Sequence, residues 1–291
     1  MSDPGHPDPA RRRVTGPRYV VAVASCKGGV GKTTIAVNVA LALRRGGATI
    51  GLFDADLHGP NVPVMLGVRR TVNRFPLRGA GGAKTMEFIP LGPSSGEAYL
   101  QPIRRFGIQM FSTGLFYADQ HAITDAEGLG SKLVARTLHD VVWGELDILL
   151  LDFPPGIGAV PQELLRGLVI DGIVVVTTPQ EMALMDTGRA LEFYRSCGVP
   201  IVGLVENMSH TVCPHCGQSI EVFCHHWEQH PAFQGLKLLG RVPLNPAITR
   251  PIDAYHPLTA LDLSQPPAAD FVAIAAAVQQ RLAAGGTGGV S

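Results

Sequence analysis

A ten-residue stretch rich in glycine and lysine carries the clearest chemistry in this sequence. Residues 25–34 read SCKGGVGKTT. Gly28, Gly29 and Gly31 let the backbone curl closely around a phosphate, because glycine has no Cβ in the way. The N–H groups of such a turn, together with the N-terminus of a following helix, form a cradle for an anion. The stretch therefore predicts a phosphate-binding loop.

The residues around these glycines fit a nucleoside triphosphate bound together with a divalent cation. Lys32 would place its positive charge on the β- and γ-phosphates, and Thr33 would offer its hydroxyl to Mg²⁺. The usual pattern, G-x-x-x-x-G-K-[ST], is broken at its first glycine by Cys26, and a second lysine, Lys27, precedes the glycine pair. We predict ATP and Mg²⁺ as ligands. The expected nucleotide contacts in this loop are Gly28, Gly29, Val30, Gly31, Lys32, Thr33 and Thr34.

Carboxylates end two other apolar segments. Asp54 and Asp56 stand at positions i and i+2, so in an extended segment their side chains point the same way. In phosphoryl transfer, one such carboxylate can hold a Mg²⁺-bound water and the other can orient the attacking water. Asp152 ends the apolar segment 147–152 before the sequence FPPG, and we expect it to bind Mg²⁺ through water. The alternative for all three is an aspartate that caps a turn or a helix.

Two further segment ends can contribute to the same site. Gly156 closes the sequence FPPG, and its N–H is placed to contact the γ-phosphate of ATP. Asn207 follows the apolar segment 201–205, and its amide can pair with the edge of an adenine base. The alternative for Asn207 is an asparagine that forms a turn.

Cys213 and Cys216 belong to the sequence CPHCG, which is typical of a metal-binding knuckle. One such pair supplies two ligands, whereas zinc sites and four-iron clusters take four. Three interpretations stay open. Cys224 or a nearby histidine completes a zinc site within the chain, two chains supply two cysteines each to a bridging iron–sulfur cluster, or the pair is redox-active or idle. The histidines concerned are His225, His226 and His230.

Strand-like and helix-like patterns alternate around these residues. The expected strands are 19–24, 49–54, 86–90, 107–111, 147–152, 172–178, 201–205 and 238–242, and the expected helices are 33–45, 131–142, 161–169, 182–197 and 268–284. Most of the strand candidates are apolar throughout, which suits parallel strands buried on both faces. We predict a single α/β domain, a doubly wound and mostly parallel sheet flanked by helices, with ligands at the carboxyl ends of the strands. Residues 69–85 and 208–235 have no regular pattern.

Composition limits the classes of partner. The chain has 291 residues, of which 46% are hydrophobic and 16% charged, so a large buried core is expected. Its formal net charge is zero, which argues against a generic nucleic-acid or anionic-membrane surface. No apolar run reaches the ~20 residues that span a bilayer. We expect neither a nucleic-acid nor a membrane partner.

The same patterns suggest boundaries and a compartment. Residues 1–17, rich in proline, aspartate and arginine, are expected to be a disordered leader without the apolar region of a secretory signal. Residues 18–284 would form the P-loop domain, with 208–235 as its metal loop, and 285–291 a flexible tail. The five cysteines show no disulfide framework, which suits a reducing, cytoplasmic setting.

Taken together, these motifs resemble the Mrp/ApbC/Nbp-type P-loop ATPases, iron–sulfur cluster carriers of the MinD/ParA/nitrogenase iron protein superfamily. The matching segments, in chain order, are KGGVGKTT, FDADLHGPNVPVMLG, WGELDILLLDFPPG, VVVTTPQEMALMD, VENMSHTVCPHCG and LLGRVPLNPAI. The resemblance implies slow ATP hydrolysis and a homodimer with ATP at each P-loop. It also implies a labile [4Fe–4S] cluster held by Cys213 and Cys216 of both subunits. The cluster would pass to apo iron–sulfur client proteins, with assembly factors as further partners and ATP driving a dimer rearrangement.

The resemblance also implies roles for single residues. Lys27 would reach across the dimer to the partner's ATP, so the catalytic candidates are Lys27, Lys32 and Asp56, with Asp56 activating water. Asp54 would stand on the Mg²⁺ side, together with Thr33 and Asp152. Asn207 and the loop around Pro243 would lie near the adenine. The chain reads PPGIGA where the family usually has PPGTGD, which is a departure beside the γ-phosphate.

A second interpretation comes from a different functional class. A ParA/MinD-type spatial organiser is an ATP-switched dimer that binds DNA or membrane, and here the CPHC pair would hold a structural zinc or be idle. Such an organiser needs a basic face or an amphipathic membrane helix. Residues 271–282 are instead apolar and alanine-rich with one charge, as in a helix that packs on a core. The sequence therefore favours the carrier.

Overall fold

The computed structural model describes residues 11–68, 74–76, 85–87, 100–116, 129–213, 215–223, 227–253, 256–257 and 267–285. The predicted tail, 285–291, thus lies outside the described residues except for its first member. Within this part of the chain, no helix is long and apolar enough to cross a membrane.

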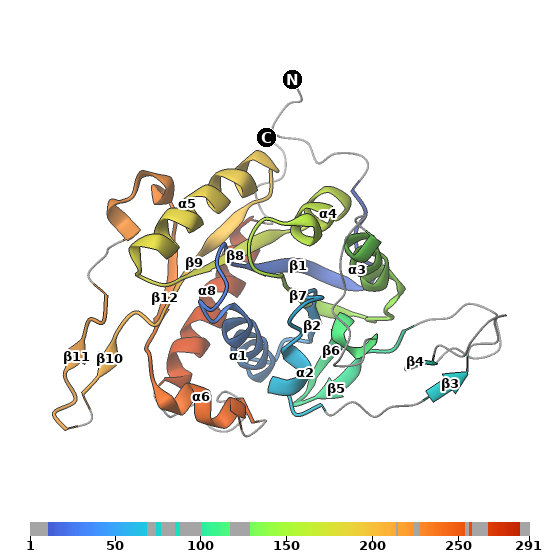
Figure 1. Cartoon of the computed structure of the whole chain (residues 1–291), viewed down its shortest axis with the longest axis horizontal. Coiled ribbons are helices and arrows are strands. Elements are labelled where there is room, and N and C mark those ends of the chain that lie inside the picture. Colours follow the sequence, from blue (N-terminus) through green and yellow to red (C-terminus); the bar gives the residue numbers. More distant parts are fainter. Residues whose placement is uncertain are drawn as a thin grey trace.

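An eight-stranded sheet forms the centre of the molecule, with the order β12-β9-β8-β1-β7-β2-β6-β5 (Figure 1). Its strands are β1 (Pro17–Ala24), β2 (Ile50–Asp54), β5 (Ile103–Arg105), β6 (Ile108–Ser112), β7 (Leu146–Asp152), β8 (Gly172–Thr177), β9 (Ile201–Asn207) and β12 (Leu238–Val242). All neighbours pair in parallel except β5, which runs antiparallel to β6. The predicted mostly parallel sheet is confirmed.

Helices cover both faces of this sheet. In Figure 1, α3 (Leu129–Asp140), α4 (Ala159–Gly167) and α5 (Glu181–Ser196) lie above the sheet, and α1 (Lys32–Arg45) and α8 (Ala268–Gly285) lie below it. Strand residues alternate between the two cores: Val20 and Ala22 of β1 face one, and Val21 and Val23 face the other. Because both faces are buried, the strands need apolar residues at every position, as the sequence pattern indicated.

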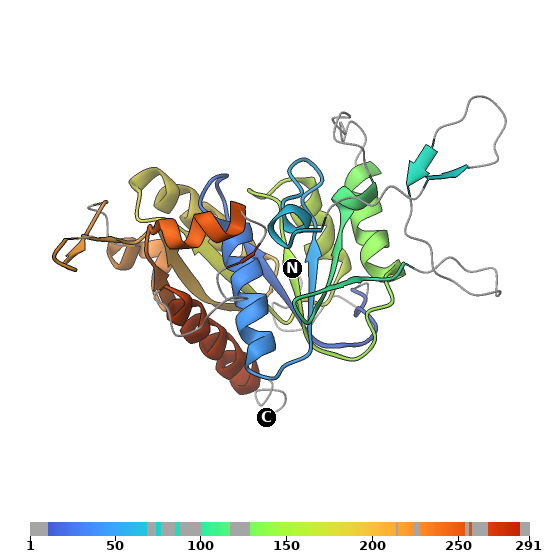
Figure 2. The same cartoon turned by 90° about the horizontal axis from the view of Figure 1, so that it is seen from below.

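Several short elements were not predicted. They are β5, α2 (Val62–Met65), α6 (Pro246–Asp253), the 3₁₀ turns Thr113–Phe116, Trp227–Gln229 and Pro231–Phe233, and a hairpin of β10 (Thr211–Val212) and β11 (Ser219–Ile220). The strand expected at 86–90 was wrongly placed in the main sheet. It corresponds to β4 (Thr85–Glu87), which pairs with β3 (Arg74–Pro76) in a separate antiparallel sheet, seen apart from the body in Figure 2. Strands of two or three residues are too short to show a period in the sequence.

The folded domain begins before the predicted boundary at residue 18. Residues 11–17 pack against the sheet and α4, because the backbone N–H of Arg12 donates to the carbonyl of Gly167 at 2.8 Å. Val14 is buried in the core that faces α3, α4 and α5. The first ten residues of the predicted leader lie outside the described residues.

A glycine brings β9 and β12 into close contact at the edge of the sheet. A Cβ on Gly203 would lie 2.6 Å from the carbonyl oxygen of Lys237, which accepts the N–H of Leu204 at 2.8 Å. The register between the two strands shifts beside this point. The absence of a side chain at residue 203 therefore lets the ladder close.

We expect Gly203→Ala to destabilise the protein by about 1–3 kcal/mol, since the added methyl group must push the backbone of Lys237 away. Gly167→Ala is the matched control, because a Cβ there meets nothing within 4 Å. The control should change stability by less than about 1 kcal/mol. Urea unfolding followed by circular dichroism measures both, and equal midpoints for the two variants would contradict the packing argument.

Candidate functional site

The predicted phosphate-binding loop lies between β1 and α1, at the carboxyl ends of β2 and β7. It borders a cleft of about 700 Å³. The cleft is lined by Ser25, Lys27, Gly28, Gly29, Val30, Gly31, Lys32, Thr33, Thr34, Asp56, Gly59, Asn61, Val64, Met65, Pro155 and Thr249. Every loop residue predicted to contact the nucleotide therefore lines one cleft, and Asp56 lines it with them.

Two of the loop glycines are required by backbone geometry. Gly29 and Gly31 have φ angles of 83° and 81°, in the left-handed region that L residues with a Cβ rarely adopt. Gly31 caps α1, because its carbonyl accepts the N–H of Ile35 at 3.0 Å. The loop N–H groups and the N-terminus of α1 thus meet at one point, which is the arrangement that binds an anion.

A buried ion pair joins the loop to the end of β7. The Nζ of Lys32 donates to Oδ1 of Asp152 at 2.5 Å and to Oγ1 of Thr33 at 3.2 Å. The Thr33 hydroxyl in turn donates to Oδ2 of Asp152 at 2.8 Å. The side chains of Lys32 and Asp152 are 7% and 1% exposed. The structure thus brings Thr33 and Asp152, two predicted Mg²⁺ ligands, together around a cation.

Burial governs the protonation of the two strand-end carboxylates. It raises the pKa of Asp152, and the charge and hydrogen bond of Lys32 oppose this. Asp54, paired in register with Asp152 on the neighbouring strand, has its pKa raised to about 8 by burial and then by the negative charge of Asp152. At this pKa, Asp54 is largely protonated at neutral pH, and a bound cation would favour its charged form.

Asp54 and Asp56 differ in their surroundings. Asp54 is fully buried and accepts hydrogen bonds from the Ser112 hydroxyl at 3.0 Å and the Asp56 N–H at 3.1 Å. Asp56 lines the cleft, and its Oδ1 accepts the N–H groups of His58 at 3.1 Å and Gly59 at 3.0 Å. Asp56 thus caps a turn, as the alternative interpretation expected, and it also lines the cleft.

Asn207 and Pro243, predicted near the adenine, are both buried and do not line the cleft. The Nδ2 of Asn207 donates to the carbonyl of Val30 at 2.7 Å, so its side chain is held against the back of the phosphate-binding loop. Contact of either residue with adenine stays a prediction. The Gly156 N–H, expected at the γ-phosphate, donates instead to the carbonyl of Ser25 at 2.8 Å.

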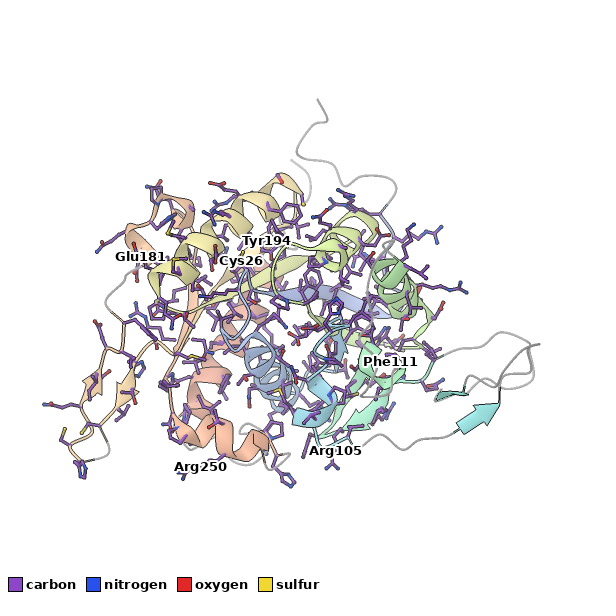
Figure 3. The ribbon with its side chains drawn as sticks, in the orientation of Figure 1. Cys26, Arg105, Phe111, Glu181, Tyr194 and Arg250 are labelled. Carbon is purple, nitrogen blue, oxygen red and sulfur yellow. The ribbon has the colours of Figure 1, made fainter. Side chains whose placement is uncertain are left out.

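Cys26 and Lys27, the two residues before the first loop glycine, lie in different surroundings. Lys27 is exposed on the rim of the cleft, as a residue that reaches toward a second subunit requires. Cys26 packs against the core beneath α5, where burial raises the pKa of its thiol. Figure 3 places Cys26 beside Tyr194 of α5 and away from Arg250 on α6. Cys26 therefore has a packing role.

The two predicted metal-binding cysteines form the turn of the β10–β11 hairpin, which projects from the body in Figure 1. The N–H of Cys213 donates to the carbonyl of Gln218 at 2.9 Å, and the N–H of Gly217 donates to the carbonyl of Cys213 at 2.9 Å. Backbone N–H groups of Cys216 and His215 face the Cys213 sulfur and lower the pKa of its thiol. This is the knuckle geometry expected from the sequence.

The described residues do not complete a zinc site around this pair. They contain no group of three or more histidine, cysteine, aspartate or glutamate side chains placed to hold a metal. His230 is engaged elsewhere: its Nδ1 accepts the N–H of Ala232 at 3.3 Å, and its ring lies 5.5 Å from that of Phe233. The other candidate ligands, Cys224, His225 and His226, lie outside the described residues.

Sequence reasoning missed residues that shape the cleft. Ser112 donates to Asp54, and Val64, Met65 and Thr249 line the cleft from α2 and α6. A serine that ends a strand carries no local signal, and both helices are too short to be recognised by their periodicity.

Comparisons with known proteins agree with this geometry. The family described as "ParA: NUBPL iron-transfer P-loop NTPase" matches residues 16–279. The iron–sulfur cluster carrier protein of Pyrococcus furiosus is 38% identical over 229 residues, 78% of this chain and 75% of that protein. The protein of the same name from Salmonella typhimurium is 34% identical over 272 residues, 93% of this chain and 68% of that protein.

Solved structures show the same fold. A nucleotide-binding protein from Archaeoglobus fulgidus, in complex with ADP, superposes with a TM-score of 0.65 at 26% identity, covering 88% of this chain and 90% of that one. The cell division ATPase MinD of Pyrococcus furiosus gives a TM-score of 0.62 at 21% identity, covering 90% of this chain and 98% of that one. At such identity the second likeness speaks for the fold alone.

The raised pKa of Asp54 predicts a pH dependence of stability. The folded value is about 8 against an ordinary 3.8, so the folded state holds this proton more tightly than the unfolded state does. The contribution of Asp54 to the free energy of unfolding is complete below its pKa in the unfolded state. It is lost as the pH rises toward its pKa in the folded state. Asparagine cannot titrate. Asp54→Asn should therefore gain stability over the wild type progressively between about pH 4 and about pH 8.

Thermal unfolding of the nucleotide-free protein at about pH 5 and about pH 8.5 measures this gain, at about 2–4 °C for each kcal/mol. Asp147→Asn is the control: hydrogen bonds from Thr49 lower the pKa of Asp147 from its ordinary 3.8, so its titration lies below this pH range and its melting-temperature difference should stay constant. A melting-temperature difference for Asp54→Asn that stays constant across this range would show that Asp54 is charged throughout.

Proposed function

The chain belongs to the ParA-type family of NUBPL iron-transfer P-loop NTPases, and on this premise we propose that it is an ATP-dependent iron–sulfur cluster carrier. One observation carries the proposal. A phosphate-binding loop and a two-cysteine turn with an exposed Cys216 occur in the same domain, and the described residues of one chain supply only two of the four ligands that a cluster takes.

ATP binding would begin with the buried ion pair. The Lys32 ammonium contacts both Asp152 and the Thr33 hydroxyl, so two candidate ligands for a small hard cation are assembled around a positive charge. We propose that Lys32 turns to the β- and γ-phosphates while Thr33, Asp152 and Asp54 hold Mg²⁺, directly or through water. Bound Mg²⁺ would neutralise charge on the phosphates.

Hydrolysis would use residues at the rim of the cleft. Asp56 lines the cleft and would orient the attacking water, and the exposed Lys27 would reach the phosphates of the partner's ATP in a homodimer. Hydrolysis is expected to be slow, because the Gly156 N–H is bonded to Ser25 and the following residues differ from the usual PPGTGD.

The cluster would be cargo, held by Cys213 and Cys216 of two subunits. The N–H groups that face the Cys213 sulfur stabilise a thiolate, which is the form that binds iron. The exposure of Cys216 leaves room for a second subunit and then for an apo-protein client or an assembly factor. Such thiols require a reducing compartment, and we place the protein in the cytoplasm.

The main experiment is anaerobic reconstitution with iron and sulfide, followed by iron, sulfide and zinc analysis and by sedimentation. We expect a dimer with about four irons and four sulfides, and loss of both on Cys213→Ala. Cys197→Ala is the control, because that partly buried thiol packs against the core at the end of α5 and should not affect loading. Stoichiometric zinc that iron cannot displace would contradict the carrier proposal and favour an ATP-switched adaptor with a structural zinc.

The two lysines should affect different steps. Lys32→Ala removes the charge expected on the β- and γ-phosphates and should weaken ATP binding by at least about tenfold, measured by isothermal titration calorimetry. Lys27→Ala should leave ADP affinity within about twofold and lower ATP turnover by at least about tenfold, because its charge would act on a partner's nucleotide. Unchanged turnover in dimeric Lys27→Ala would exclude the role in trans.

A further inference from the structure

The phosphate-binding loop and the cysteine hairpin are joined by a short stretch of chain. Strand β9 ends at Asn207, and Cys213 follows six residues later. Asn207 touches the phosphate-binding loop, whereas Cys213 opens the turn of the hairpin. Along the chain, residues 207–213 are therefore the shortest connection between the phosphate-binding loop's contact and the cysteine turn.

The contact between Asn207 and the phosphate-binding loop is tight. The amide of Asn207 is 5% exposed and donates to the Val30 carbonyl at 2.7 Å. A Cβ on Gly31 would lie only 2.2 Å from Nδ2 of Asn207 and 3.9 Å from Cε of Met208. The loop backbone at Val30 and Gly31 therefore cannot move far without moving the end of β9.

The residue that follows Asn207 has an unusual backbone. Met208 has a φ of 54°, in the left-handed region, and Phe106 is the one other described non-glycine residue with a positive φ. A long side chain in this region is strained, and such strain persists only where the surroundings impose it. Met208 is thus a point at which a change of the Asn207 contact can be converted into a rotation of the chain.

Beyond Met208, the chain is attached to the end of β12. The N–H of Ser209 donates to the Val242 carbonyl at 3.1 Å, and the N–H of Leu244 donates to the His210 carbonyl at 2.7 Å. The segment after β12 leads into α6, whose Thr249 lines the nucleotide cleft. The two segments that reach the hairpin and the cleft are therefore fastened to one another.

Two ion pairs of Arg241 connect the end of β9 to the return arm of the metal loop, which is the chain segment that leads from the hairpin back to β12. The Nε of Arg241 lies 3.3 Å from Oε1 of Glu206, and its Nη2 lies 3.0 Å from Oε1 of Glu228. Glu206 immediately precedes Asn207, and Glu228 follows the hairpin. Both arms of the loop that carries the cysteines thus connect to the end of β9.

We propose that Asn207 is a positioning residue that sets the orientation of the Cys213–Cys216 turn according to the state of the phosphate-binding loop. When the phosphates draw Lys32 away from Asp152, the backbone at Val30 shifts, Asn207 follows, and Met208 acts as the hinge. Arg241 makes the return arm move with it. This proposal rests on the proposed function, because it concerns how that nucleotide site regulates that cluster site.

Hydrogen exchange of the full-length, cluster-free protein tests the proposal, with Mg²⁺ and a slowly hydrolysed ATP analogue as the probe. In the wild type, we expect residues 27–34 to become protected and the exchange rate of the hairpin amides of Cys213 and Gly217 to change by at least about threefold. In Met208→Gly, where glycine adopts a positive φ without strain, the loop should still respond and the hairpin response should fall by at least half.

Arg241→Ala should also reduce the hairpin response while nucleotide affinity stays unchanged, because Arg241 does not line the cleft. Arg136→Ala is the matched control: its partner Asp140 lies four residues away on α3, remote from both sites. Light scattering of the same samples records the oligomeric state. An undiminished response in dimeric Met208→Gly and Arg241→Ala would assign the change to dimer formation and overturn the proposal.

The outcomes separate this inference from the function on which it rests. Protection of residues 27–34 without any change in the hairpin would overturn the coupling and leave the ATP-dependent carrier in place. No protection of residues 27–34 would overturn nucleotide binding, and with it both proposals.

Discussion

The nucleotide site depends on one buried ion pair, between Lys32 of the phosphate-binding loop and Asp152 at the end of β7. An unpaired charge at this depth would be strongly unfavourable, so this pair holds the loop and the strand end together. One ammonium group offsets one carboxylate, and the neighbouring Asp54 responds by holding a proton. The net charge of these three side chains is therefore close to zero. In the proposed cycle, Mg²⁺ and the phosphates bind as Lys32 leaves Asp152 and Asp54 loses its proton.

The two proposed binding sites have opposite physical characters. The phosphate-binding loop is anchored by α1 and by β1 and β7, the central strands of the sheet, which suits a site that needs fixed N–H groups. The cysteine turn sits on a two-stranded hairpin, and such a hairpin is marginally stable without further packing. A less rigid hairpin suits a cluster that must be loaded and released. The short connection from Asn207 to Cys213 joins the rigid loop region to the less stable hairpin.

The likeness to MinD shows how little the fold alone decides. That structure has the same fold at 21% identity and is described as a cell division ATPase, so the fold by itself does not assign a function to this chain. In this chain, the features that bear on the choice of function are the hairpin after β9 and the packing of the last helix. Phe271, Ile274 and Val278 of α8 face the core, so this helix is occupied in holding the domain together.

Local pattern in the sequence was enough for the phosphate-binding loop, the parallel sheet and the cysteine knuckle. A glycine-rich turn between an apolar strand and a helix determines its own geometry, and so does a turn between two cysteines, because the contacts involved are close in sequence. The register of the strands decided the rest. It placed Asp152 beside Lys32, 120 residues away, and Ser112 beside Asp54, 58 residues away.

Three further features also had to come from the tertiary structure. They are the contact of Asn207 with Val30, the packing of residues 11–17 against α4 and its side of the sheet, and the pairing of β4 with β3 in a separate sheet. A sequence pattern identifies the side chains that can do chemistry, but only the folded chain decides which of them already hold one another before a ligand arrives.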